Sequence, residues 1–276
     1  MSRFVSNLLC SGALLLLSAA AGAAEPEHLT IPLSDPAQPA RLEVALVQGS
    51  ITIVAGQPGQ VVLVASGRQD EDPEVDRDEP DTEHAGMRRL SKNVFGLDAE
   101  EKDNRVSIGA GSWTQSVDLR VEVPAGSSVE ASTVNDGEVA VSGLSGELVL
   151  HNTNGGISVA DVTGPVNAST VNGDVKVAFG PKLALAAMAF STLNGDIDLT
   201  LPAGAGADVV LRSDNGEIYS DFDVALEKRP ARVESERKHG KYRVEVSREL
   251  TGKIGAGGPE LFLKTFNGDI ALRQAK

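Results

Sequence analysis

Short runs in which apolar and polar residues alternate follow one another along most of the chain. The first runs are LEVALV (42–47), SITIVAG (50–56) and VVLVASG (61–67), and glycine or proline lies between them. Period-two alternation between such breaks is typical of β-strands that bury one face. The chain is therefore predicted to be all-β.

From residue 132 the strands form a repeat. Its units are STVNDGEVAV (132–141), NTNGGISV (152–159), STVNGDVKV (169–177), STLNGDIDL (191–199), SDNGEIYS (213–220) and KTFNGDIAL (264–272). A second kind of turn, such as GLSGE (143–147), lies between units. Self-similarity at a period of about 20 residues is typical of stacked repeat folds.

Each unit turns at an Asn-Gly pair. Both residue types tolerate positive φ, so the pair predicts a tight turn. The predicted turn-forming residues are Asn154, Gly155, Asn172, Gly173, Asn194, Gly195, Asn215, Gly216, Asn267 and Gly268. The first aliphatic residue after each turn is β-branched, as at Val175 and Ile197, which predicts a buried column.

Two architectures fit these turns. One is a β-solenoid, a β-helix-like stack of roughly 20-residue coils with like turns on like turns. The other is an antiparallel β-meander or sandwich, because Asn-Gly is also a hairpin signal. The same turn chemistry returns once per unit and not after every strand, which favours the solenoid.

An acidic residue follows most of the Asn-Gly turns, as at Asp174, Asp196 and Asp269. In a stack these carboxylates would lie about 4.8 Å apart, and each like-charge contact costs roughly 1 kcal/mol in water. Three interpretations remain open: the acids accept hydrogen bonds from turn amides, calcium bridges them, or solvent screens them. Asp174, Asp196 and Asp269 are thus candidate calcium ligands, and no other cofactor is expected.

The N-terminus carries a predicted signal peptide at 1–24. It combines Arg3, the apolar run LLLLSAAAG (14–22) and small residues up to Ala24. Residues 25–276 are expected to form a single β-repeat domain that is exported to the periplasm or the cell exterior. Cys10, the one cysteine, would leave with the signal, so no disulfide is expected.

Two charged segments interrupt the strand pattern. An acidic loop is predicted near 68–90 and a mixed-charge insertion near 227–241. The chain has 39 acidic and 25 basic residues and a net charge of −14, which repels nucleic acid and favours cationic partners. After the signal peptide, no stretch approaches the about 20 apolar residues that span a membrane.

Two segments carry a resemblance to a known family. SDNGEIYSDFD (213–223) and GGPELFLKTFNGDI (257–270) resemble the bacterial toastrack domain, an adhesin-like β-strand-repeat domain of unknown function, and the likeness extends over 40–276. The resemblance implies a β-solenoid-like domain on exported or membrane-anchored proteins. Some relatives belong to systems that sense envelope stress. It implies no catalytic residues.

The expected function is therefore a non-enzymatic, envelope-associated binding or scaffold module. Its exposed ladders of Thr, Asn and acid are expected to bind an envelope glycan, a cationic peptide or a protein partner. The alternative is an enzyme acting on an envelope polysaccharide, since glycoside cleavage uses two carboxylates about 5–9.5 Å apart. Asp174 with Asp196, or Asp196 with Asp198, are the candidate pairs. Among the four histidines, His151 is the one singled out, because it falls in the repeat region beside Asn152.

Overall fold

The computed structural model describes residues 27–67, 97–110, 116–183, 186–227, 232–238, 241–247 and 249–276. Within these ranges the secondary structure is all β, and no helix is long and apolar enough to cross a bilayer. The predicted signal peptide and the predicted acidic loop at 68–90 lie outside the described residues.

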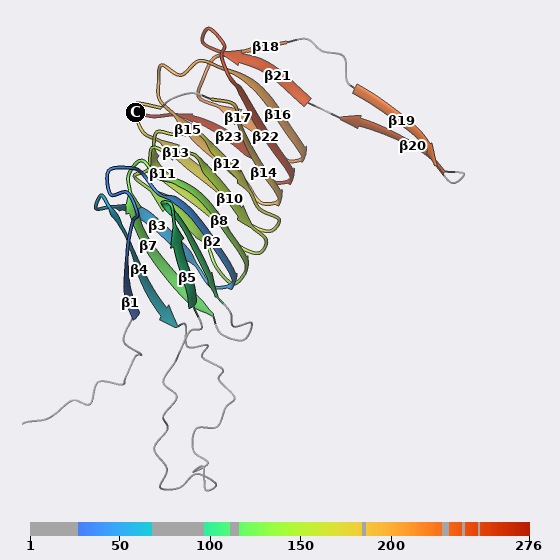
Figure 1. Cartoon of the computed structure of the whole chain (residues 1–276). Helices are drawn as coiled ribbons and strands as arrows, with labels where there is room; N and C mark the ends of the chain where they lie inside the picture. The colour runs from blue at the N-terminus through green and yellow to red at the C-terminus, as the bar shows by residue number, and fades with distance from the viewer. Residues whose placement is uncertain are drawn as a thin grey trace, which may run out of the picture.

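Two large sheets face each other and a separate hairpin leaves the stack (Figure 1). In spatial order, sheet A contains β1 (Glu27–Pro32), β4 (Gln60–Gly67), β7 (Val117–Pro124), β3 (Ile51–Gly56), β9 (Val139–Ser142), β11 (Ile157–Val162), β13 (Val175–Phe179), β15 (Ile197–Leu201), β23 (Ile270–Gln274) and β17 (Ile218–Ser220). Sheet B contains β18 (Val224–Leu226), β21 (Glu249–Ile254), β16 (Ala207–Asn215), β22 (Glu260–Asn267), β14 (Met188–Asn194), β12 (Val166–Ser169), β10 (Leu148–Asn152), β8 (Ser128–Asn135), β2 (Arg41–Gln48), β6 (Arg105–Ala110) and β5 (Leu97–Lys102).

The repeat units form the coils of a β-solenoid. Each unit places its first strand in sheet B and its second strand in sheet A, and the Asn-Gly turn joins the two sheets. Neighbouring coils pair in parallel, with Ile157 beside Val175 and Val175 beside Ile197. A meander would pair successive strands antiparallel. The parallel register therefore confirms the solenoid.

The coils do not stack in chain order. The C-terminal unit, β22–β23, lies between β14–β15 and β16–β17 and pairs in parallel with both. After β17 the chain passes through β18 and returns along β21, antiparallel to β16, before it enters the gap as β22. At the other end, β2–β3 lies between β6–β7 and β8–β9. Sequence periodicity shows which segments are coils but not which coils are neighbours.

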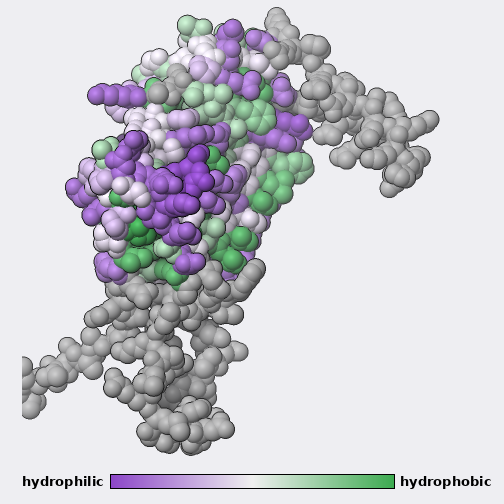
Figure 2. All heavy atoms as spheres, viewed as in Figure 1, coloured by the Kyte–Doolittle hydropathy of each residue, from purple (hydrophilic) through white to green (hydrophobic). Residues whose placement is uncertain are grey.

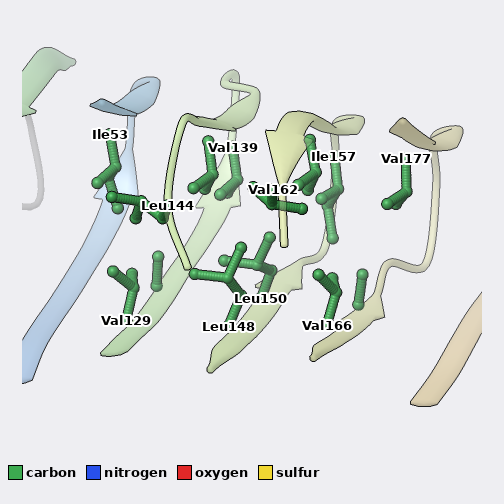
Figure 3. Close-up of a cluster of buried hydrophobic side chains, with 14 of the residues drawn as sticks. Ile53, Val129, Val139, Leu144, Leu148, Leu150, Ile157, Val162, Val166 and Val177 are labelled. Carbon is green, nitrogen blue, oxygen red and sulfur yellow. The ribbon is translucent and has the colours of Figure 1, made fainter. Parts of the chain in front are cut away.

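The hydrophobic core fills the space between the sheets. Figure 3 shows Ile53, Val139, Ile157 and Val177 of sheet A facing Val129, Leu148 and Val166 of sheet B. Burial alternates along each strand; in β13 the inward Val175, Val177 and Phe179 are at most 5% exposed. Removing such apolar area from water drives the packing of one coil on the next.

The insertion predicted as a charged loop near 227–241 contains a strand. β19 (Arg232–Lys238) pairs antiparallel with β20 (Lys241–Ser247), and this hairpin projects away from the stack in Figure 1. The prediction weighted the many charges.

Candidate functional site

In the motifs that carry a threonine two positions before the asparagine, as at Thr170, Thr192 and Thr265, this side chain points into the protein. Its hydroxyl donates a hydrogen bond to the carbonyl oxygen of the motif glycine in the neighbouring coil. The bonds are Thr170 to Gly155 at 2.8 Å, Thr192 to Gly173 at 2.9 Å and Thr265 to Gly195 at 2.9 Å. These threonines are at most 6% exposed. The expectation of an exposed threonine ladder was wrong, because the hydroxyls satisfy buried carbonyls between coils.

The asparagines form a side-chain ladder along the turn edge. Each Nδ2 donates to the Oδ1 of the neighbouring coil: Asn154 to Asn135 at 2.8 Å, Asn172 to Asn154, Asn194 to Asn172 and Asn267 to Asn194 at 2.7 Å, and Asn215 to Asn267 at 3.1 Å. None of the five predicted turn asparagines has a positive φ. Their role is the bond between coils, which an in-register parallel stack makes possible.

The motif glycines allow the coils to approach each other closely. Gly155, Gly173, Gly195 and Gly268 have φ between +151° and +158°. A Cβ at Gly195 would lie 2.1 Å from the carbonyl oxygen of Gly173, and one at Gly216 would lie 2.0 Å from that of Gly268. At Gly155, Gly173, Gly195 and Gly268, glycine is therefore required both by the backbone conformation and by the contact with the next coil, and at Gly216 by the contact.

The acidic residues connect coils through main-chain amides. Oδ1 of Asp174 accepts from the Asp196 amide at 3.0 Å, Oδ1 of Asp196 from the Asp269 amide at 2.8 Å, and Oδ1 of Asp269 from the Glu217 amide at 2.8 Å. The Asp196 amide, followed by the Lys176 ammonium, lowers the pKa of Asp174. The row runs 174, 196, 269, 217, following the order of the stacked coils.

In each of the three candidate calcium ligands, the carboxylate Oδ1 thus already accepts a hydrogen bond from a backbone amide of the neighbouring coil. Oδ2 of Asp174 accepts from Lys176 Nζ at 2.9 Å, so both of its oxygens are engaged. In the part of the chain that the structure describes, no group of three or more His, Cys, Asp or Glu residues could hold a metal ion.

A shallow groove of about 400 Å³ lies beside this edge, on the outer face of sheet A. Its floor carries small side chains on β9, β11 and β13, among them Ala140, Ser158, Ala160 and Ala178. Longer side chains of Lys176 and Arg273 border them, which makes the face concave.

Ion pairs fix the charged side chains of the groove. Arg273 Nε donates to both oxygens of Asp198, at 2.9 and 2.7 Å, and this hydrogen bonding raises the pKa of Arg273. Lys176 pairs with Asp174 as described above. The groove therefore combines apolar and hydroxyl positions with preoriented donors and acceptors.

Two residues of the candidate catalytic pairs, Asp174 and Asp198, lie in environments that do not suit a general acid. A general acid needs a raised pKa. The pKa of Asp174 is lowered, and Asp198 is held by Arg273. His151 lies on the opposite sheet, where its Nδ1 is 2.7 Å from Ser169 Oγ on the exposed outer face.

The groove was not predicted from the sequence. The outward positions of the strands, Ser158 and Lys176 for example, alternate with the core column and could have been grouped from the repeat alignment. Arg273 could not have been placed beside Asp198, because the C-terminal unit enters the stack out of order.

The Toastrack DUF4097 family model matches residues 112–273. No curated protein matches the chain. One similar structure is described as a "putative cell adhesion protein" from Clostridium sporogenes, with 10% identity, TM-score 0.42, and coverage of 91% of this chain and 100% of the other. Another, a "putative adhesin" from Bacteroides fragilis, has 12% identity, TM-score 0.35 and coverages of 91% and 97%. At these scores neither likeness supports an inference about function.

Proposed function

Because the chain belongs to the Toastrack DUF4097 family, we propose that it is an adhesin-like, non-enzymatic binding module that holds a glycan of the cell envelope on the outer face of sheet A. The groove on that face carries the proposal. It crosses several coils, so one ligand chain can lie across repeated equivalent positions.

The chemistry of the groove suits a carbohydrate. Asp198 can accept hydrogen bonds from sugar hydroxyls, and Lys176 and Arg273 can donate them. The small side chains of Ala140, Ala160 and Ala178 would let a sugar ring approach the sheet closely. Polar groups that are already oriented lose little entropy on binding.

The predicted export of the chain supports an envelope location in this proposal. The predicted signal peptide at 1–24 would carry the chain to the periplasm or the cell exterior, where envelope polymers are present. The stack would act there as a rigid scaffold, and a role in envelope stress would follow from what it binds.

The test is cosedimentation of the purified protein with isolated bacterial cell envelopes. We expect saturable binding that falls about tenfold in Ala178→Arg, because the added side chain would occupy the groove. The matched control is Ala189→Arg, an exposed alanine on the outer face of sheet B, which should bind normally. Absence of saturable binding, or an equal loss in both variants, would contradict the proposal.

A further inference from the structure

A row of exposed apolar side chains runs along the Asn-Gly edge. Val171, Leu193 and Phe266 occupy the position between the buried threonine and the ladder asparagine on three successive coils, and they are 39%, 46% and 44% exposed. We call these residues the apolar stripe. Figure 2 shows hydrophobic side chains along the edge where β14 and β22 end. Single exposed apolar residues are common, but a contiguous row marks an interaction surface.

The fold does not require apolar residues at this position. Thr153 occupies it in the β10–β11 coil, and Asp214 occupies it in the β16–β17 coil. Both coils keep the asparagine ladder through Asn154 and Asn215. Since polar side chains are accepted there, the apolar stripe serves something other than the stability of the stack.

An acidic row flanks the stripe on the same three coils. Asp174, Asp196 and Asp269 follow the ladder asparagines and continue to Glu217 on the next coil. The opposite flank carries Ser169, Ser191 and Lys264 on the outer face of sheet B. The surface is thus apolar in the centre and mainly anionic on one side.

The stripe has the spacing of a helix face. Coils repeat every about 4.8 Å, while residues at i, i+3 or i+4, and i+7 of an α-helix rise about 5 Å from one to the next. Leucines at those helical positions can each meet one coil. In an extended strand, residues on one face are about 6.8 Å apart and would fall out of step.

We propose that the apolar stripe is the docking site for a cationic amphipathic helix of a partner. The apolar face of the helix would cover Val171, Leu193 and Phe266, and its Lys or Arg residues would meet the acidic row. Helix recognition through apolar anchors of this kind is a recurring binding mode. A second copy of the chain fits less well. A standard protein–protein interface uses about 20–30 residues a side, and the apolar stripe with its flanking rows is much smaller.

The test uses a synthetic peptide of leucine and lysine, about 18 residues long, with its leucines on one helical face. Fluorescence anisotropy measures its binding to the purified full chain. We expect Val171→Thr, Leu193→Thr and Phe266→Thr together to raise Kd at least about tenfold. Threonine is chosen because Thr153 occupies this position in the same fold. Leu226→Thr, an exposed leucine on β18, is the matched control and should leave Kd unchanged.

Two comparisons separate this site from nonspecific attraction. A peptide of the same composition with scattered leucines has the same charge but no apolar face, and it should bind at least about tenfold more weakly. Asp196→Asn with Asp269→Asn should weaken binding about threefold or more and reduce its salt dependence. Equal binding by both peptides, or an unchanged Kd in the triple threonine variant, would overturn the proposal.

The site is independent of the groove on sheet A. Ala178→Arg should leave peptide binding unchanged, and the triple threonine variant should leave envelope cosedimentation unchanged. Loss of peptide binding in Ala178→Arg would contradict a separate site. Failure of envelope binding with normal peptide binding would overturn only the glycan proposal.

Discussion

At the scale of single residues, the threonine, asparagine, glycine and aspartate of the Thr-x-Asn-Gly-Asp motif each have a contact between coils. The threonine hydroxyl satisfies a glycine carbonyl, the asparagine bonds the asparagine of the neighbouring coil, and the aspartate accepts an amide from the adjacent coil, as Thr192, Asn194 and Asp196 show. The glycine leaves room for these contacts. The geometry of stacking therefore accounts for the recurrence of these four residues within the chain.

The glycine requirement can be tested at Gly195. In Gly195→Ala the new Cβ would lie 2.1 Å from the Gly173 carbonyl oxygen, at a φ of +155°. We expect the free energy of unfolding to fall by about 3 kcal/mol or more in urea titration. Gly204→Ala is the control, because no atom lies within 4 Å of its added Cβ. Equal stability of the two variants would refute the close approach.

The carboxylate of Asp174 predicts a pH dependence. Its pKa is lowered in the folded chain, first by the Asp196 amide and then by Lys176, so its contribution to stability is complete above the unfolded value of about 3.9 and disappears as pH falls through the folded value. Asp174→Asn should be less stable than the original chain at pH 7, and the gap should close toward about pH 2.

Urea unfolding over that pH range measures the effect. Asp223→Asn, at an exposed position, is the control for the loss of one acidic side chain. A gap for Asp174→Asn that stays constant with pH would show that the carboxylate charge is not responsible.

At the scale of elements, the C-terminal unit is an interior part of the stack. β22 pairs with both β14 and β16, and β23 pairs with both β15 and β17. The β19–β20 hairpin is the reverse case, because among the described strands its two members pair only with each other. A segment at the end of the chain therefore lies inside the stack, while a segment before it in the chain pairs with no described strand of the stack.

Two deletions test this difference. Removing 260–276 should abolish cooperative thermal unfolding, because β16 and β17 lose their parallel partners. Replacing 229–247 with a short turn should leave the melting temperature within a few degrees of the original. Circular dichroism melting reports both. A truncated chain with unchanged melting would contradict the interior position of β22–β23.

The acidic row makes a further prediction at this scale. Since Asp174 uses both oxygens and Asp196 and Asp269 each use Oδ1, we expect millimolar calcium to leave the melting temperature unchanged. A ligand of the folded state would raise it by mass action. A calcium-dependent rise that disappears in Asp196→Asn would instead support the bridging interpretation.

At the scale of the whole molecule, the sequence predicts the solenoid but not its order. Alternation and turn spacing identify the coils because each coil buries the same kind of residue at the same position after its turn, as at Val175 and Ile197. The neighbour of each coil depends on contacts between residues far apart in the sequence, such as Arg273 with Asp198, which are 75 positions apart. The groove and the apolar stripe depend on that order, so neither could be read from the repeat alone.

Disulfide trapping of neighbouring coils tests the stack most directly. With Cys10 replaced by Ala, Ser191→Cys with Lys264→Cys places two thiols on paired residues of β14 and β22. Ser191→Cys with Arg212→Cys would be paired only if the coils followed chain order, because Lys264 lies between them. We predict that mild oxidation closes the first pair and leaves the second reduced. Closure of the second pair, with the first remaining reduced, would contradict the interior C-terminal coil and the two surfaces built on it.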